Sequence, residues 1–475
     1  MVNSNRNQPP PARTLRAGSP ARDRASQLAG QLADHGVVWF AIAAGLGVTH
    51  NKMARRAALR GVGSMAIAGT TARLAAAGIE RIWPQGWHVP LPAGRRIPAM
   101  SLRPATRPAL AAAFAVGVSL ELPGLAVPMS ALALVAGPSR APARWRGGII
   151  TGFAVGAAAG TATLRWWPRR PMQPAEAARP RHEAPRLLTG EGLVLVVNRG
   201  AGSVTPGLVD WLRAELPDAK LIESAKGQDL AAALRPAAQG AQVLGAAGGD
   251  GTVNAAASIA LDAELPLLVI PAGTLNHFAA DLGVISPKQA VAALRDGDSV
   301  LVDVGVAGDR LFLNTSSTGI YVDLVRARKR LEPRLGKRPA GLVALVDVLR
   351  RGRPHDLIVD GRKRRVWLLF CGNCCYAPQG FAPAYRPNMA DGLLDIRVLD
   401  AEPLFARTRL ITSVITGTLG RSRVYETWST PAMDVAAADG GPAGLAVDGE
   451  VTDTGPSISI RKRPRQLLVY RLAAN

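Results

Sequence analysis

Residues 242–261 read Gln-Val-Leu-Gly-Ala-Ala-Gly-Gly-Asp-Gly-Thr-Val-Asn-Ala-Ala-Ala-Ser-Ile-Ala-Leu. The run 242–246 predicts a buried strand and 253–261 predicts a helix, with a glycine-rich turn between them. Glycines let the backbone approach a bulky anion, and the start of the helix offers unpaired N–H groups and the positive end of its dipole. Asp250 can orient a metal ion or a substrate hydroxyl, and Thr252 can bind a phosphate oxygen. The alternative interpretation is an ordinary glycine-rich turn with an aspartate cap.

A second turn of the same kind follows the next predicted strand, 266–270. It reads Pro271-Ala272-Gly273-Thr274-Leu275-Asn276-His277-Phe278-Ala279 and again leads into a helix. Strands and helices alternate over residues 191–298, at 192–197, 205–215, 220–223, 229–239, 242–246, 253–261 and 266–270. This order predicts an α/β domain with a parallel, doubly wound sheet. Both turns then lie at the carboxyl ends of strands, where ligands bind in such sheets.

The pattern changes after residue 298. Short apolar runs, many in hairpin pairs, predict strands at 300–306, 311–314, 356–359, 366–371, 394–399, 433–437, 443–447 and 457–461. One helix is expected at about 402–419. Residues 299–475 are therefore predicted to form a second, mainly antiparallel β domain.

The N-terminal part has a different composition. Residues 1–35 are rich in Pro, Arg, Ser and Gln and predict a disordered basic tail. Residues 36–171 contain four apolar stretches and predict an all-α, membrane-associated domain. The best candidate span, 147–164, has 18 uncharged residues and is followed by Arg165-Trp166-Trp167-Pro168-Arg169-Arg170, which places the downstream half in the cytoplasm. The alternative is a soluble domain of Ala- and Gly-rich helices. The proline-rich segment 172–190 is expected to be a linker.

The charge is unevenly distributed along the 475 residues. Residues 1–182 carry 23 Lys and Arg but 5 Asp and Glu, whereas residues 183–475 carry 34 and 30. The arginines of the basic half flank apolar runs and are not interleaved with aromatic residues, so the pattern favours an anionic membrane over nucleic acid as partner. Three cysteines are too few for a disulfide framework and suit a reducing compartment.

The two turns together resemble the diacylglycerol kinase catalytic family, which includes bacterial lipid kinases and sphingosine kinases. The resemblance covers about residues 190–472. Gly248-Gly249-Asp250-Gly251-Thr252 is shared with NAD kinases and phosphofructokinases, whereas Gly273-Thr274-Leu275-Asn276 followed by Phe278-Ala279 is similar to the lipid-kinase form. Asn198-Arg199-Gly200-Ala201-Gly202 resembles the family's opening Asn-Pro-x-Ser-Gly turn, with Arg199 in place of proline. The implied fold is the two-domain lipid kinase fold.

This resemblance implies a set of site residues. ATP would be held by Asn198, Ser224, Gly248, Gly249, Asp250, Gly251, Thr252, Val253, Asn254, Gly273, Thr274 and Asn276. The segment Asp391-Gly392-Leu393-Leu394-Asp395 matches a structural magnesium site, with the Asp391 carboxylate and the backbone carbonyls of Asn388 and Leu393 as ligands. Glu450, in Asp448-Gly449-Glu450, would accept the proton and act with Asp250 in catalysis. Taken alone, that tripeptide is more typical of a solvated hairpin turn.

Residues 36–171 also resemble the type 2 phosphatidic acid phosphatase family. The resemblance rests on Arg55–Gly61, Phe114–Gly117, Ser139-Arg140 and the Trp-Trp-Pro-Arg-Arg-Pro segment. Arg107 stands where that family has the histidine of its Pro-Ser-Gly-His segment. An always-charged guanidinium cannot replace an imidazole nucleophile, so we expect a degenerate domain that serves as an anchor.

Together these features predict an ATP- and magnesium-dependent lipid kinase at the cell membrane, with its kinase domain in the cytoplasm. Its substrate would be a lipid alcohol such as diacylglycerol, giving phosphatidic acid for phospholipid biosynthesis, and no nucleic-acid partner is expected. The alternatives are a kinase of a soluble substrate that resembles NAD kinase, and a non-catalytic protein that binds nucleotide or lipid at the membrane. Whether the chain forms a homodimer is left open.

Overall fold

The computed structural model describes residues 37–49, 52–82, 88–90, 96–98, 103–137, 146–171, 173–180, 183–224, 230–380, 383–441 and 444–473. The chain divides into two compact units, Met1–Arg169 and Arg170–Asn475. Each unit is described separately. The expected basic tail, 1–35, and the Ser139-Arg140 pair lie outside the described residues.

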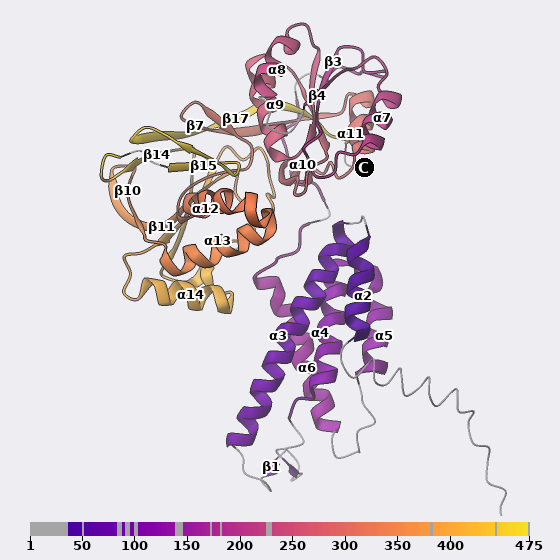
Figure 1. The fold of residues 1–475 in the computed structure, drawn as a ribbon, viewed down its shortest axis with the longest axis vertical. Coiled ribbons are helices and arrows are strands. Elements are labelled where there is room, and N and C mark those ends of the chain that lie inside the picture. The colour runs from indigo at the N-terminus through magenta and orange to yellow at the C-terminus, as the bar shows by residue number, and fades with distance from the viewer. Residues whose placement is uncertain are drawn as a thin grey trace, which may run out of the picture. The chain divides into compact units, whose positions relative to one another are not determined.

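The first unit is a helical bundle (Figure 1). Its helices are α2 (Val37–Val48), α3 (Lys52–Ile82), α4 (Thr106–Glu121), α5 (Ala126–Ala136) and α6 (Arg146–Ala162), with a short hairpin of β1 (His88–Pro90) and β2 (Arg96–Pro98). Small residues let α4 and α6 pack closely, because a Cβ built on Gly156 would lie 2.2 Å from the Ala109 carbonyl oxygen. Pro123 breaks the predicted run 109–136 into α4 and α5.

One buried ion-pair network holds this bundle together. Arg56 and Arg60 of α3 both pair with Glu121 at the end of α4, at 2.8 and 2.6 Å. Arg60 also donates to Thr163 Oγ1 (2.9 Å) and lies over the Trp167 ring, 5.2 Å from its centroid. Arg56 and Arg60, two arginines of the segment Arg55–Gly61 that the sequence singled out, are therefore engaged inside the helical unit.

The second unit begins with the predicted parallel sheet. Its strands are β3 (Leu193–Asn198), β4 (Lys220–Ser224), β5 (Val243–Gly248) and β6 (Leu267–Pro271), in the order β4-β3-β5-β6. The accompanying helices are α7 (Pro206–Glu215), α8 (Leu230–Ala238), α9 (Asp250–Asp262), α10 (His277–Leu282) and α11 (Pro287–Asp296). Sequence determines α7 locally, since Thr205 caps its first turn and Pro206 occupies its first position.

The β-rich part of the second unit lies beside this sheet (Figure 1). Its strands are β7 (Ser299–Ala307), β8 (Arg310–Phe312), β9 (Thr315–Gly319), β10 (His355–Val359), β11 (Arg362–Asn373), β12 (Leu394–Asp400), β13 (Tyr425–Thr430), β14 (Ala432–Ala437), β15 (Gly444–Val447), β16 (Glu450–Asp453) and β17 (Ser457–Tyr470). The pairing is antiparallel throughout this part. Its core consists mainly of alternating Leu, Ile and Val side chains from facing strands.

Three features differ from the sequence prediction. Two helices, α12 (Ile320–Leu335) and α13 (Lys337–Arg351), occupy a segment for which no helix was predicted, and the later helix is shorter, α14 (Ala406–Thr416). β17 continues beyond residue 461. It pairs with β7 on both sides of a register shift between Arg463 and Leu467, and Val469 also pairs with Leu267 of β6. The end of the chain therefore joins the α/β sheet to the β-rich part.

The described residues of the expected linker, 172–190, lie along the second unit and do not form a free tether. Ala175 N–H donates to Asp281 O (2.9 Å), Glu176 N–H to Pro387 O (2.8 Å) and Ala178 N–H to Leu301 O (3.1 Å). Tyr470 Oη donates to Pro185 O at 2.6 Å. The prolines prevent regular secondary structure here, but the remaining backbone groups still find partners on the folded unit.

Candidate active site

The two glycine turns touch each other. Gly248 of β5 is in register with Pro271 of β6, and Ala272 N–H donates to Gly248 O at 3.0 Å. A Cβ built on Gly273 would lie only 2.3 Å from Gly249 Cα. Real carbon atoms need roughly 3.5 Å, so only a glycine at position 273 lets the turns approach this closely.

Asn276 shapes the second turn. It has a left-handed backbone (φ 52°), and its Oδ1 accepts a bond from Gly273 N–H at 2.8 Å. Its buried Nδ2 has no hydrogen-bond partner among the residues that the structure describes. A buried donor without a partner is costly, so this amide group is available to a bound ligand.

A third turn, which follows β3, lies beside the two glycine turns. Asn198, at the end of β3, donates from Nδ2 to Thr252 Oγ1 (2.9 Å), while its Oδ1 accepts from Gly200 N–H (2.9 Å). A Cβ on Gly202 would lie 3.0 Å from Thr274 Oγ1. Turns from three strands therefore meet at the start of α9, where backbone N–H groups and the helix dipole favour an anion.

The other predicted nucleotide residues have more varied surroundings. Asp250 Oδ1 accepts from Phe278 N–H (3.2 Å), so it links the starts of α9 and α10. Val253 is buried in the core of the α/β sheet, and Asn254 Nδ2 donates to Leu311 O (3.1 Å). The Val253 side chain thus contributes to core packing, and the Asn254 side chain connects α9 to β8. Ser224 is buried at the end of β4.

The Arg199 side chain, which stands in place of the expected proline, is paired with a carboxylate. Its guanidinium forms an ion pair with Glu223, and Arg213 pairs with the same carboxylate. The hydrogen bond from Arg199 lowers the pKa of Glu223 and, in return, the pKa of Arg199 is raised. Backbone N–H of Arg199 donates to Ser224 O at 3.0 Å, which keeps this turn next to the end of β4.

Asp448 and Glu450 come from the β-rich part. Asp448 has a left-handed backbone (φ 44°), and its carboxylate accepts from the N–H groups of Leu313 (2.9 Å), Asn314 (3.0 Å) and Thr315 (2.8 Å). Burial raises the pKa of Asp448 to about 6, although these three donors act to lower it. The tripeptide forms the hairpin turn between β15 and β16, but the Asp448 carboxylate is bound by backbone N–H groups of the turn after β8.

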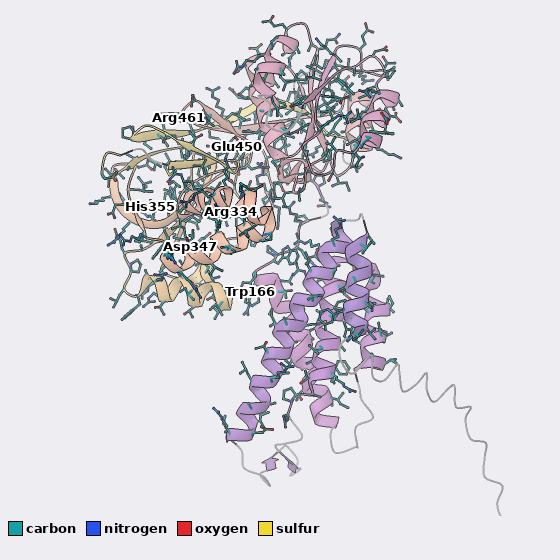
Figure 2. The ribbon with its side chains drawn as sticks, viewed as in Figure 1. Trp166, Arg334, Asp347, His355, Glu450 and Arg461 are labelled. Atoms are coloured by element: carbon teal, nitrogen blue, oxygen red, sulfur yellow. The ribbon has the colours of Figure 1, made fainter. Side chains whose placement is uncertain are left out.

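Glu450 is exposed at the start of β16, on the side of the β-rich part that faces the α/β sheet (Figure 2). Its Oε1 lies 3.8 Å from the position that a Cβ on Gly251 would occupy. The structure therefore brings the Glu450 carboxylate to the start of α9, beside the three turns.

The predicted metal ligands are on a different turn, after residue 387. Asp391 Oδ1 accepts from Leu393 N–H (2.9 Å) and its Oδ2 from Cys375 N–H (2.8 Å). Leu393 O accepts from Cys374 N–H at 3.1 Å. Asn388 forms a bridge with Glu176, and its Oδ1 accepts from Ala390 N–H.

Known proteins with similar sequences identify the family. The family model described as "Diacylglycerol kinase catalytic domain" matches residues 193–307. A "Probable lipid kinase YegS-like" of Pseudomonas aeruginosa is 30% identical over 245 residues, which is 49% of this chain and 78% of that protein. The chain belongs to the diacylglycerol kinase and YegS-like lipid kinase family. The resemblance that the sequence motifs indicated is thus confirmed at the level of the kinase family.

For other relatives, the matched region covers a smaller fraction of the relative's own length. A "Diacylglycerol kinase" of Mycobacterium tuberculosis is 30% identical over 192 residues, 38% of this chain and 62% of that protein. An uncharacterized Synechocystis protein is 25% identical over 48% of this chain and 55% of its own length. The chain therefore spans less than two thirds of these relatives. A putative diacylglycerol kinase from Bacillus anthracis matches the structure with a TM-score of 0.46 and 20% identity, over 60% of this chain and 99% of that one.

The residues of this family member do not fit a divalent ion at Asp391. Each Asp391 oxygen and the Leu393 carbonyl accepts one backbone bond, which leaves a lone pair on each, but the Lys462 ammonium lies 3.8 Å from Asp391 Oδ1. A positive charge at that distance opposes a second cation. Sequence reasoning missed Lys462 and Asp303, because both lie on strands far along the chain from residue 391.

A buried arginine was missed as well. Arg386 donates to Asp281 Oδ2 (2.8 Å), Leu313 O (2.6 Å) and Asn314 Oδ1 (3.3 Å), so it connects α10 to the turn after β8. This is the same turn whose backbone N–H groups donate to the Asp448 carboxylate.

His277, at the start of α10, is hydrogen-bonded to Arg170, and burial lowers its pKa. An imidazole with a lowered pKa is mainly uncharged at neutral pH, which suits its partly buried position.

Proposed function

We propose that the protein is an ATP-dependent lipid kinase. It transfers the γ-phosphoryl group of MgATP to the hydroxyl of a lipid alcohol such as diacylglycerol, which gives phosphatidic acid. The observation that carries this proposal is the position of the Glu450 carboxylate beside three strand-end turns that meet at the start of α9. Family membership supports the same reaction class.

The turns supply the phosphate site. In this proposal, backbone N–H groups of Gly249–Thr252 and of Thr274, together with Asn276 Nδ2, bind the phosphates of ATP, while Gly273 N–H stays bonded to Asn276 Oδ1. Thr252 Oγ1 is held by Asn198 and adds a hydroxyl. Preorganised donors of this kind stabilise the charge that develops during phosphoryl transfer, and they need no rearrangement at the moment of reaction.

Glu450 acts as the proton acceptor. The lipid hydroxyl oxygen forms a bond to the γ-phosphorus while the bond to the ADP oxygen breaks, and the hydroxyl proton passes to the Glu450 carboxylate. Asp250 positions the start of α10 through Phe278 N–H and supports the arrangement of both glycine turns. Asp448 keeps Glu450 in place by fixing the backbone of residues 313–315.

The location of the substrate argues for action at a membrane. α14 and the residues before it expose Leu404 (75%), Phe405 (70%) and Ile415 (67%), and α12 carries a run of basic residues. Such a surface fits an anionic bilayer. Two helices, Met53–Ile82 and Gly147–Arg165, are long and apolar enough to cross a membrane. We propose that the first unit anchors the kinase on the cytoplasmic face and, because Arg107 replaces the nucleophilic histidine, has no phosphatase activity.

Radiolabelled ATP and the full chain in mixed micelles test the proposed function. Phosphatidic acid is expected with diacylglycerol, and no labelled product is expected with NAD. Glu450→Gln removes the proton acceptor and should lower kcat about 10²–10⁴-fold. Asp250→Asn should lower it as well, whereas Glu191→Gln, an exposed position before β3 at the opposite end of that strand from the turns, serves as a matched control at wild-type activity.

Two results would overturn this proposal. Labelling of NAD instead of lipid would indicate the soluble-substrate kinase. Absence of transfer by the wild type, or full activity in both site variants, would indicate a non-catalytic nucleotide- or lipid-binding protein.

A further inference from the structure

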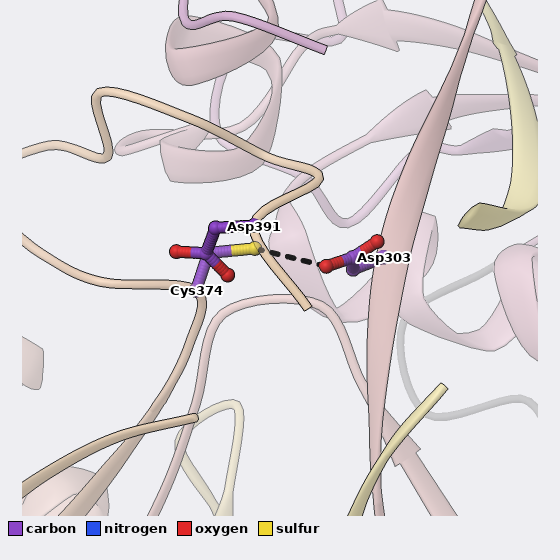
Figure 3. A group of neighbouring side chains, drawn as sticks. All are labelled: Asp303, Cys374 and Asp391. Atoms are coloured by element: carbon purple, nitrogen blue, oxygen red, sulfur yellow. Dashed lines mark hydrogen bonds between the residues drawn. The ribbon is translucent and has the colours of Figure 1, made fainter. Parts of the chain in front are cut away.

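A buried lysine lies within a cluster of acidic and polar side chains in the β-rich part. Lys462 Nζ is 2.7 Å from Asn373 Oδ1, 2.9 Å from Cys374 Sγ, 3.4 Å from Asp303 Oδ2 and 3.8 Å from Asp391 Oδ1. The Lys462 and Asp303 side chains are 1% and 0% exposed. Figure 3 shows three of the four other members of the cluster, Asp303, Cys374 and Asp391, close to one another.

The position of Lys462 in its strand explains how an ammonium group reaches this place. Side chains alternate along β17, so that Arg461 and Arg463 are exposed while Lys462 is buried. Its partner across the strand pair is Gly305 of β7, and the Phe312 ring fills the space where a side chain at position 305 would lie. Lys462 lies on the buried face of β17, and its ammonium reaches the Asp303 and Asp391 carboxylates.

The cluster gives the ammonium a full set of partners. Asp303 Oδ1 also accepts from Arg465 N–H (2.7 Å) and Oδ2 from Gly392 N–H (2.8 Å). Asp391 is held by the N–H groups of Cys375 and Leu393. Lys462 thus neutralises one of two carboxylates whose other partners are backbone N–H groups and, for Asp303 Oδ2, the Cys374 thiol at 3.8 Å. By accepting these backbone bonds, the two carboxylates fix the position of the segments that contain Cys375, Gly392 and Arg465.

We propose that the Lys462 ammonium is a built-in cation that takes the place of a divalent metal ion in this cluster. Sequence motifs predicted magnesium at Asp391, Asn388 and Leu393, but the positive charge at this position is supplied by the chain itself. The folding of the β-rich part is then independent of divalent ions. This inference concerns stability and ion binding, so it stands whether or not the protein proves to be a kinase.

Thermal unfolding of the full chain without nucleotide tests the inference. The wild type should have the same Tm in EDTA and in millimolar MgCl₂ or MnCl₂. Lys462→Met keeps the length of the side chain but removes its charge, so the buried Asp303 carboxylate and the partly buried Asp391 carboxylate remain without a counter-ion. Its Tm should fall in EDTA and recover by about 3 °C or more when Mg²⁺ or Mn²⁺ is added. The exposed Lys288→Met serves as the matched control and should behave as the wild type.

Two measurements decide the matter even if Lys462→Met does not fold. Metal analysis of wild type purified without chelator should find no tightly bound divalent ion, and Asp391→Asn should lower Tm equally in EDTA and in Mg²⁺. One divalent ion per wild-type chain would overturn the inference. A wild-type Tm that rises with Mg²⁺ and loses this response in Asp391→Asn would do so too.

Discussion

The contact between the two glycine turns allows a sharp test with Gly273→Ala. The backbone at Gly273 does not have a positive φ, so alanine brings no conformational strain of its own. Its methyl group would lie 2.3 Å from Gly249 Cα and 3.0 Å from Gly249 N. The neighbour is backbone, which cannot rotate away as a side chain would. The turns must therefore separate by about 1 Å to reach an ordinary contact distance.

Overpacking of this kind costs about 1–3 kcal/mol, which corresponds to a fall in Tm of roughly 3–10 °C for a unit of this size. Gly249→Ala is the matched control, because its Cβ would have its nearest neighbour, Gly273 Cα, at an ordinary 3.5 Å. We expect that variant to lose only about 0.5–1 kcal/mol, as an alanine at a helix N-cap does.

The assay is thermal unfolding of the full chain with and without MgATP. Separated turns would no longer present their N–H groups to the same phosphates, so Gly273→Ala should also lose most of the rise in Tm that MgATP produces. If Gly273→Ala unfolds at the same temperature as Gly249→Ala and responds to MgATP as the wild type does, the argument from turn contact is wrong.

Two further predictions concern buried charges. Arg386→Met leaves Asp281 buried without its partner and should cost about 3–5 kcal/mol in chemical denaturation, of which the double variant with Asp281→Asn should regain a part. If the double variant is less stable than Arg386→Met, the ion pair is not the cause. Burial raises the pKa of Asp448 from its ordinary 3.8 to about 6, so its contribution to stability is present below about pH 4 and is lost as pH rises through 6. Asp448→Asn lacks this titration, and the Tm of the variant relative to wild type should rise between pH 4.5 and 7.5; a constant difference would contradict the pKa shift.

The sequence predicted the parallel sheet well because its signals are local. Residues 242–261 contain a complete strand, turn and helix, and α7 carries its own cap at Thr205. The two helices between residues 320 and 351 were missed. α12 does have an apolar face, but both helices are rich in charged residues and α12 contains Pro333, so neither segment has the overall apolar character of the helices that were predicted.

The individual positions of the candidate site were also recognisable from motifs, whereas their surroundings were not. The glycines of both turns, Asn276 and Glu450 could be named because short patterns contain them. The unpartnered Asn276 amide, the carboxylate of Asp448 under three backbone donors and the salt bridge of Arg386 required coordinates. Each of these depends on contacts between segments that are distant in the chain.

The amino-acid sequence by itself determined which residues form the strands of the parallel sheet, which turns are made of glycines and which segments are apolar enough for a helix bundle. Each of these properties depends on residues that are only a few positions apart. Only the tertiary structure decided that β17 returns to the first sheet and that Lys462 meets Asp303 and Asp391. The alternation of side chains predicts that one face of β17 is buried. Which side chains lie against that face depends on how strands that are distant in the sequence pair with one another. The sequence neighbours of Lys462 are charged, as on an exposed strand. It is nevertheless a buried counter-ion, because the pairing of distant strands places two carboxylates beside it.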